Sequence, residues 1–158
     1  MQKESELIQE CLNEILRTSP ALKFVLLIDK DGIIISKVAK MAFFDSESEI
    51  NKISVLSTAV YSTAEEQGVN TPFGELRIAT CEYKNGIIFI TPLKFGIVVI
   101  GSESFNTIGL IRTKIISIRQ KIDRLLEDYV CGDQTEADSE VNEQLKILFE
   151  GNEPGFFN

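Results

Sequence analysis

Residues that could support catalysis or metal binding are few in this sequence and are not grouped. The chain of 158 residues contains no histidine, so the commonest general base and metal ligand is missing. Its three cysteines, Cys11, Cys81 and Cys131, are far apart and have no metal-ligand or disulfide spacing. Glycine-rich phosphate loops and serine nucleophile elbows are also missing. Missing motifs do not exclude an enzyme, but they mark no residue for a catalytic mechanism, and we predict no cofactor or metal site. The widely spaced cysteines indicate reduced thiols in a cytoplasmic protein.

One acidic cluster, Asp29-Lys30-Asp31-Gly32, has the alternating carboxylates with which a calcium-binding loop begins. The further ligands and the terminal glutamate of such a loop are missing. An Asp-Gly pair between two apolar runs is instead typical of a hairpin turn. We interpret the cluster as a turn.

The densest positive charge lies on a predicted helix over residues 106–129. Its basic residues are Arg112, Lys114, Arg119, Lys121 and Arg124. A helix with this many cations could form a phosphate-binding face. Such a face is more often solvated, and acidic residues are near enough in the sequence to balance it, namely Glu103, Asp123, Glu127 and Asp128. We therefore favour a solvated face over a phosphate-binding one.

The net charge of −8 lies mostly near the C-terminus. Residues 1–128 carry 15 basic and 17 acidic groups, whereas residues 129–158 carry 1 and 7, so the two parts contribute −2 and −6. A nearly neutral folded part does not favour binding to nucleic acid or to an anionic membrane. The sequence contains no run of about 18 apolar residues, so it predicts no transmembrane helix.

Three strands near the middle of the chain are expected to organise the fold. Residues 76–83, 87–93 and 95–100 form a meander with tight turns between its strands. The first strand alternates apolar and polar residues, as an edge strand does, and the other two are apolar on both faces. A second strand pair, 24–28 and 33–38, flanks the turn at 29–32.

Three helices must cover this sheet. The first spans 4–17 and the third spans 106–129. Residues 131–133 are expected to end the third helix. The second begins at Ser46, which with Glu49 fits a capping box, and Gly68 is expected to be its left-handed stop.

The chain should therefore divide into a domain over 1–131 and an acidic flexible tail over 132–158. In that tail, residues 133–140 are expected to be a linker and residues 151–158 to be disordered. Between them, a short amphipathic segment carries Val141, Leu145, Leu148 and Phe149. It is too short to be a stable helix alone, so it needs a surface on which to dock.

The second helix has two apolar stripes, and one sheet can cover only one of them. The stripe expected to face the sheet contains Ile50, Ile53, Ser57, Val60 and Ala64. The other stripe is made mostly of small residues, which permit the close approach of another helix: Val55, Leu56, Ala59 and Thr63. Another helix of the same chain or a partner chain could cover this second stripe. We favour a partner chain, because the first and third helices can each be assigned to the sheet.

With these elements in place, the sequence resembles the roadblock family of dynein-light-chain-like domains, which are related to longin domains. The segments that carry the resemblance are 25–33, 73–76, 85–86, 91–93 and 109–112, and it covers about residues 4–128. The resemblance implies an α+β sandwich of topology αββαβββα. Its five-stranded antiparallel sheet would have the order 2-1-5-4-3, with the first and third helices on one face and the second on the other.

The resemblance also implies a dimer, homodimeric or with another roadblock chain, that binds a small Ras-like GTPase without being an enzyme. Second helices would pack together and strands 76–83 would pair edge to edge. The dimer interface would then contain Val55, Leu56, Ala59, Thr63, Leu76, Ile78, Thr80 and Cys81. The GTPase contacts would come from the polar side of the second helix, namely Asn51, Lys52, Ser54, Thr58, Ser62 and Glu65. Some family members are GTPase-activating proteins, but no arginine here is marked as a catalytic finger.

Two other functions fit a sheet wrapped by helices. A PAS-like or profilin-like sensory module would need an enclosed pocket of a few hundred Å³. The large isoleucine, leucine and phenylalanine residues at central positions are expected to fill that space. A structural subunit of a transport or motor complex would instead be found bound to unlike chains.

Overall fold

The computed structural model describes residues 2–41 and 43–150. Its elements are the helix α1 (Gln2–Leu16), the strands β1 (Leu22–Ile28) and β2 (Ile34–Ala39), the helix α2 (Glu47–Val69), the strands β3 (Ala79–Tyr83), β4 (Gly86–Pro92) and β5 (Ile97–Ser102), the 3-10 turn η1 (Phe105–Thr107) and the helix α3 (Ile108–Glu150). This order confirms the predicted topology αββαβββα.

The five strands form one antiparallel sheet in the order β2-β1-β5-β4-β3. The predicted fold class and strand order are confirmed. β1 and β5 lie in the middle, and almost all their side chains are buried, because helices cover the sheet on both faces. β2 and β3 are the two edges.

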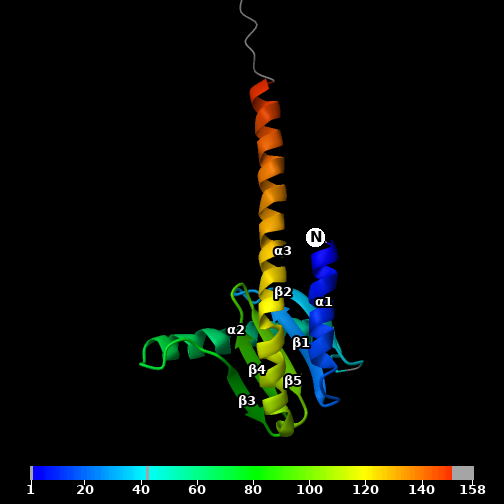
Figure 1. Cartoon of the computed structure of the whole chain (residues 1–158), viewed down its shortest axis with the longest axis vertical. Coiled ribbons are helices and arrows are strands. Elements are labelled where there is room, and N and C mark those ends of the chain that lie inside the picture. The colour runs from blue at the N-terminus through cyan, green and yellow to red at the C-terminus, as the bar shows by residue number, and fades with distance from the viewer. Residues whose placement is uncertain (1, 42, 151–158) are drawn as a thin grey trace, which may run out of the picture.

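The helices separate into two layers, as Figure 1 shows. On one face, α1 and α3 pack with the sheet in a large cluster that includes Leu12, Phe89 and Ile118. On the other face, α2 adds only Ile50 to a smaller buried cluster around Phe24 and Val99, with Ile53 and Tyr61 packed against it. The predicted placement of the helices is confirmed, and the face under α2 is the less completely covered one.

The acidic cluster is a turn, as predicted. Asp29 Oδ1 accepts hydrogen bonds from the N–H groups of Asp31 and Ile33, at 2.9 and 2.8 Å. Gly32 has φ +89°, a conformation that suits glycine. Among the side chains that the structure describes, no three of His, Cys, Asp or Glu come together as a possible metal site.

The start of α2 follows half of the predicted capping box, and its end does not follow the prediction. Ser46 Oγ accepts from the N–H of Glu49 as expected, but Glu49 Oε2 accepts from the N–H of Asp45 instead of that of Ser46. Gly68 is not a left-handed stop, because it lies inside the helix, which ends at Val69. A Cβ at Gly68 would lie 2.3 Å from the carbonyl oxygen of Gly74, so glycine is needed there for close approach of the following loop.

The expected end of the third helix at residues 131–133 is wrong. α3 continues to Glu150, and residues 133–140, expected to be a linker, are helical. A helix interior tolerates one glycine at a cost of about 1 kcal/mol, and the residues after Gly132 include many good helix formers. The helix extends away from the sheet (Figure 1). The side chains of Val141, Leu145 and Leu148 on this part of it are exposed. The side chain of Phe149 and residues 151–158 lie outside the described part, and the domain division at 131/132 stays a prediction.

A chain that ends at Gly132 is expected to unfold within a few degrees of the full chain. The described side chains between 140 and 148 are exposed, so their removal takes little apolar area out of the core. A chain that ends at Lys121 is the control, since it also loses Ile122 and Leu126, which are 1% and 0% exposed. Circular dichroism melting measures both. A loss of more than about 3 kcal/mol in the first chain would contradict the prediction.

Candidate interaction surface on helix α2 and strand β3

Helix α2 presents a stripe of apolar side chains to solvent. Val55 and Leu56 are 60% and 64% exposed. Ala59 and Thr63, the other members of the second stripe, are also exposed. No helix within the described residues covers this stripe. The alternative in which another helix of the same chain covers it therefore does not hold for that part of the chain. Figure 1 shows the C-terminal part of α2 projecting sideways beyond the sheet.

A narrow apolar groove runs between α2 and the β3–β4 hairpin. Leu56 and Val60 line its helical side, while Cys81, Tyr83 and Ile88 line its sheet side. Its volume is about 90 Å³. Val60 was expected to pack on the sheet, but it is 38% exposed because the groove separates it from the strands. The groove therefore continues the exposed stripe of α2 down to strand β3.

Strand β3 has a hydrogen-bonded partner strand on one side only, which is β4. It is shorter than expected, since it begins at Ala79 and leaves Leu76 and Ile78 in the preceding segment. The side chain of Glu65 holds that segment against α2 by accepting from the N–H of Leu76 at 2.8 Å. Thr80 is exposed and Cys81 is half-buried. An edge strand of this kind can pair with another chain.

Three of the six predicted GTPase contacts are used inside the chain. Ser54 is 2% exposed, and its hydroxyl donates to the carbonyl oxygen of Gly32 at 2.9 Å. Thr58 is half-buried beside the same turn, where a Cβ at Gly32 would lie 3.1 Å from its Oγ1. Glu65 binds the segment before β3. The expectation that Ser54 is a surface contact is wrong, because the β1–β2 turn packs on this side of α2. Asn51, Lys52 and Ser62 are exposed.

Cys11 and Cys81 lie in different parts of the fold. Cys11 is buried between α1 and the sheet, and burial raises the pKa of its thiol, which keeps it protonated. Cys81 lines the apolar groove described above. Among the helices that the structure describes, none is long and apolar enough to span a membrane.

Comparisons with known proteins give a family and a fold. A family model described as "Mitogen-activated protein kinase kinase 1 interacting" matches residues 6–131. The search of curated proteins finds no match. MglB in a tetrameric arrangement is 13% identical, with a TM-score of 0.69 over 79% of this chain and 91% of that one.

Two further solved structures share the fold. The gliding protein MglB from Thermus thermophilus is 13% identical, with a TM-score of 0.69 over 79% of this chain and 92% of that one. A Roadblock/LC7 domain from Streptomyces avermitilis is also 13% identical, with a TM-score of 0.59 over 72% of this chain and 96% of that one. These likenesses show the roadblock fold, which confirms the resemblance in the sequence.

Proposed function

The chain belongs to the mitogen-activated protein kinase kinase 1 interacting family and has the roadblock fold, and from this premise we propose that it is a dimeric, non-enzymatic regulator or scaffold for a small Ras-like GTPase. The observation that carries the proposal is the exposed apolar stripe on α2 next to the open edge of β3. A lone chain would leave both in water, where they favour association.

The proposed dimer buries both features at once. The small residues Ala59 and Thr63 let two α2 helices approach closely, while Val55 and Leu56 supply apolar area. Pairing of two β3 strands then extends the sheet across both copies. A tetrameric arrangement is known for MglB, a protein of the same fold, which supports self-association as a property compatible with this architecture.

The GTPase is proposed to bind across the polar side of the paired α2 helices. Asn51 and Ser62 are exposed there, and their short side chains lose little rotamer entropy when a partner covers them. Lys52 is exposed and can pair with a partner carboxylate. Helix α2 contains no arginine that could act as a catalytic finger, so we propose binding rather than stimulation of GTP hydrolysis.

An Asn51→Arg/Ser62→Arg double variant is expected to weaken GTPase binding at least about tenfold, because two bulky cations would occupy the contact surface. Neither side chain makes a packing contact in the chain's core, so the fold and the dimer should persist. Candidate GTPases from the same genome, each in both nucleotide states, are titrated by calorimetry.

A Gln9→Arg/Gln120→Arg double variant is the matched control, since it adds the same charge to exposed positions of α1 and α3 on the opposite face. Equal affinity for the two double variants would move the GTPase site off α2. If the wild-type chain bound none of the GTPases, a structural role in a larger complex would be favoured instead.

A further inference from the structure

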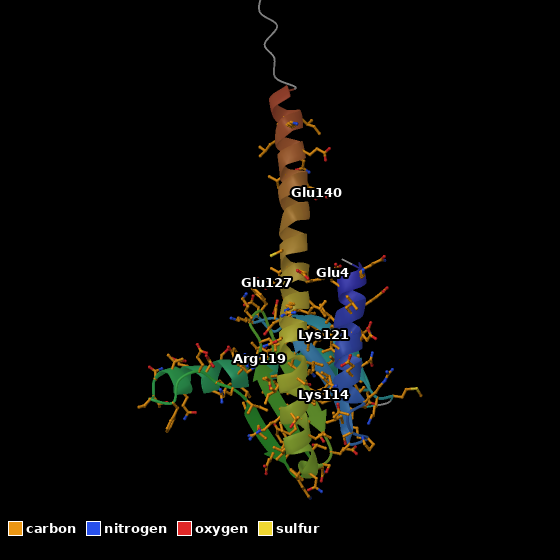
Figure 2. All side chains as sticks on the ribbon, in the orientation of Figure 1. Glu4, Lys114, Arg119, Lys121, Glu127 and Glu140 are labelled. Atoms are coloured by element: carbon orange, nitrogen blue, oxygen red, sulfur yellow. The ribbon has the colours of Figure 1, made fainter. Side chains whose placement is uncertain are left out.

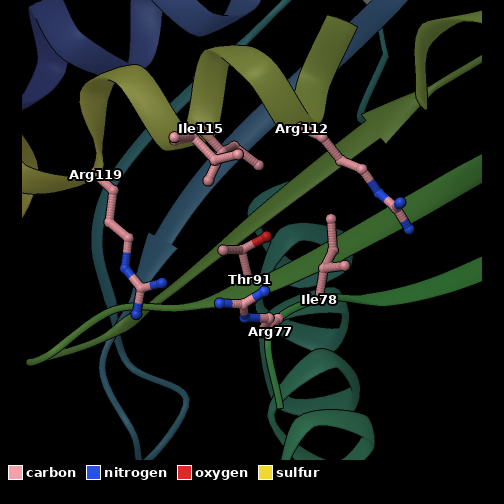
Figure 3. A pocket seen from close by; sticks show the side chains of 7 residues that line it. Arg77, Ile78, Thr91, Arg112, Ile115 and Arg119 are labelled. Atoms are coloured by element: carbon pink, nitrogen blue, oxygen red, sulfur yellow. The ribbon is translucent and has the colours of Figure 1, made fainter. Parts of the chain in front are cut away.

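A cavity of about 530 Å³ lies between α3 and the β3 side of the sheet, on the face opposite α2. Figure 3 shows Arg112 and Arg119 leaving α3 on either side of Ile115, with Arg77 and Thr91 below them on the sheet side. The cavity is therefore bordered by three arginines that come from two different elements. Its volume is within the range of protein sites that hold small organic ligands.

The fold brings these residues together from distant parts of the sequence. Positions 112, 115 and 119 are spaced by three and four, so they share one side of α3, and Ile115 is only 7% exposed. Thr91 has the same strand parity on β4 as Phe89, which packs on the α3 side. Arg77 belongs to the segment just before β3 and reaches the cavity from below the helix (Figure 3).

The acidic residues near α3 neutralise its lysines more than its arginines. Lys114 and Lys121 lie 3.6 and 3.3 Å from the carboxylate of Glu14 on α1, on the side of α3 that Figure 2 shows next to α1. Arg119 Nε is 3.9 Å from Asp123 Oδ2, and Asp123 Oδ1 also accepts from the N–H of Lys94. Within the described residues, no carboxylate forms an ion pair with Arg77 or Arg112. The cavity therefore has an excess of positive charge.

The wall of the cavity also contains a polar atom without a partner. Thr91 is 3% exposed, and its hydroxyl has no hydrogen-bond partner in the described part of the chain. Buried hydroxyls in proteins nearly always have a partner. Valine would fill the same volume without leaving such an atom, so threonine at this position is explained best by a ligand that accepts its hydrogen bond.

We propose that this cavity binds a small organic phosphate monoester. A phosphate monoester has about two negative charges and three terminal oxygens, which three guanidinium groups and one hydroxyl can contact from two sides. A single carboxylate has one charge and two oxygens, and would leave donors unused. The apolar walls made by Ile78 and Ile115 suit the organic part of the ligand, and the volume exceeds that of inorganic phosphate alone.

The test is calorimetric titration of the full chain with phenyl phosphate, followed by inorganic phosphate and benzoate. Phenyl phosphate is expected to bind saturably, to raise the melting temperature, and to bind more weakly at high salt. Inorganic phosphate, which lacks the apolar group, and benzoate, which lacks the phosphate, should each bind at least about tenfold more weakly. Equal binding of benzoate and phenyl phosphate would overturn the phosphate assignment.

Single variants locate the site. Arg77→Gln and Arg112→Gln are expected to weaken phenyl phosphate binding at least about tenfold, and Thr91→Val several-fold. Arg124→Gln, an exposed arginine of α3 that does not line the cavity, should bind as the wild type does. Because Arg77 and Arg112 are exposed and valine matches threonine in shape, all these variants should fold.

Binding to vesicles of phosphatidylcholine with phosphatidic acid is measured last, because the headgroup of phosphatidic acid also carries a phosphate monoester. Binding to vesicles without binding to phenyl phosphate would show a surface for lipid and overturn the proposal of a small-molecule site. An equal loss of affinity in Arg77→Gln and Arg124→Gln would also overturn it, since it would indicate general attraction to surface charge.

Discussion

The Ala59→Arg variant is expected to be a monomer under conditions in which the wild-type chain is a dimer. Ala59 is exposed on α2 between Leu56 and Thr63, so an arginine there can extend into solvent in the monomer. In a packed pair of α2 helices, the same arginine would fill the space that the second backbone needs and would lose water around its charge. We expect the dimer dissociation constant to rise at least about 100-fold, which corresponds to about 2.7 kcal/mol.

Light scattering after size exclusion, over a range of protein concentrations, measures this change. Circular dichroism should show an unchanged helix and strand content for the monomer. Gln120→Arg is the matched control, because it places the same charge on an exposed position of α3. Thr63→Arg, one turn further along α2, should act as Ala59→Arg does. If both α2 variants stay dimeric at the wild-type concentrations, the dimer forms on another surface.

The sheet and the helical layers on its two faces could be predicted because the apolar pattern of each strand indicates which of its faces are buried. β4 and β5 are apolar on both faces, as strands between two helical layers must be, and β3 alternates as an edge strand does. Turn residues such as Gly32 mark where strands end. The strand order itself came from the resemblance to the roadblock family, since periodicity alone does not say which strands pair.

The polar side of α2 could not be interpreted correctly from its own sequence. Helical periodicity places Ser54 and Thr58 opposite the apolar stripe, and polar residues there are usually exposed. In the structure, the β1–β2 turn packs against them, and the hydroxyl of Ser54 satisfies the carbonyl oxygen of Gly32. That contact joins residues far apart in the sequence, so no local pattern predicts it.

The cavity between α3 and the sheet could not be predicted from the sequence either. The sequence marked the basic residues of α3 as either a phosphate-binding or a solvated face. It gave no sign that Arg77 and Thr91 would lie beneath them, because these residues are brought to α3 only by the packing of the sheet. The structure separates the basic residues into lysines that pair with α1 and arginines that border the cavity.

The Gly101→Ala variant is expected to lose about 3 kcal/mol of unfolding free energy, because the position opposite Phe24 has no room for a side chain. Gly101 on β5 is directly paired with Phe24 on β1, and a Cβ there would lie 2.1 Å from Phe24 Cε1. The ring of Phe24 lies against Phe43 and Phe44, with centroids 5.4 and 5.1 Å away. It cannot move aside without displacing the loop that leads into α2.

Urea unfolding measures the loss, and Gly109→Ala is the matched control. Gly109 lies at the start of α3 with no atom within 4 Å of its added Cβ, so alanine there should leave stability unchanged or raise it by up to about 1 kcal/mol. Combining Gly101→Ala with Phe24→Leu should cost less than the sum of the two single changes, because the smaller side chain leaves space for the Cβ. Additive costs would mean that the strain lies in the β5 backbone rather than against the ring.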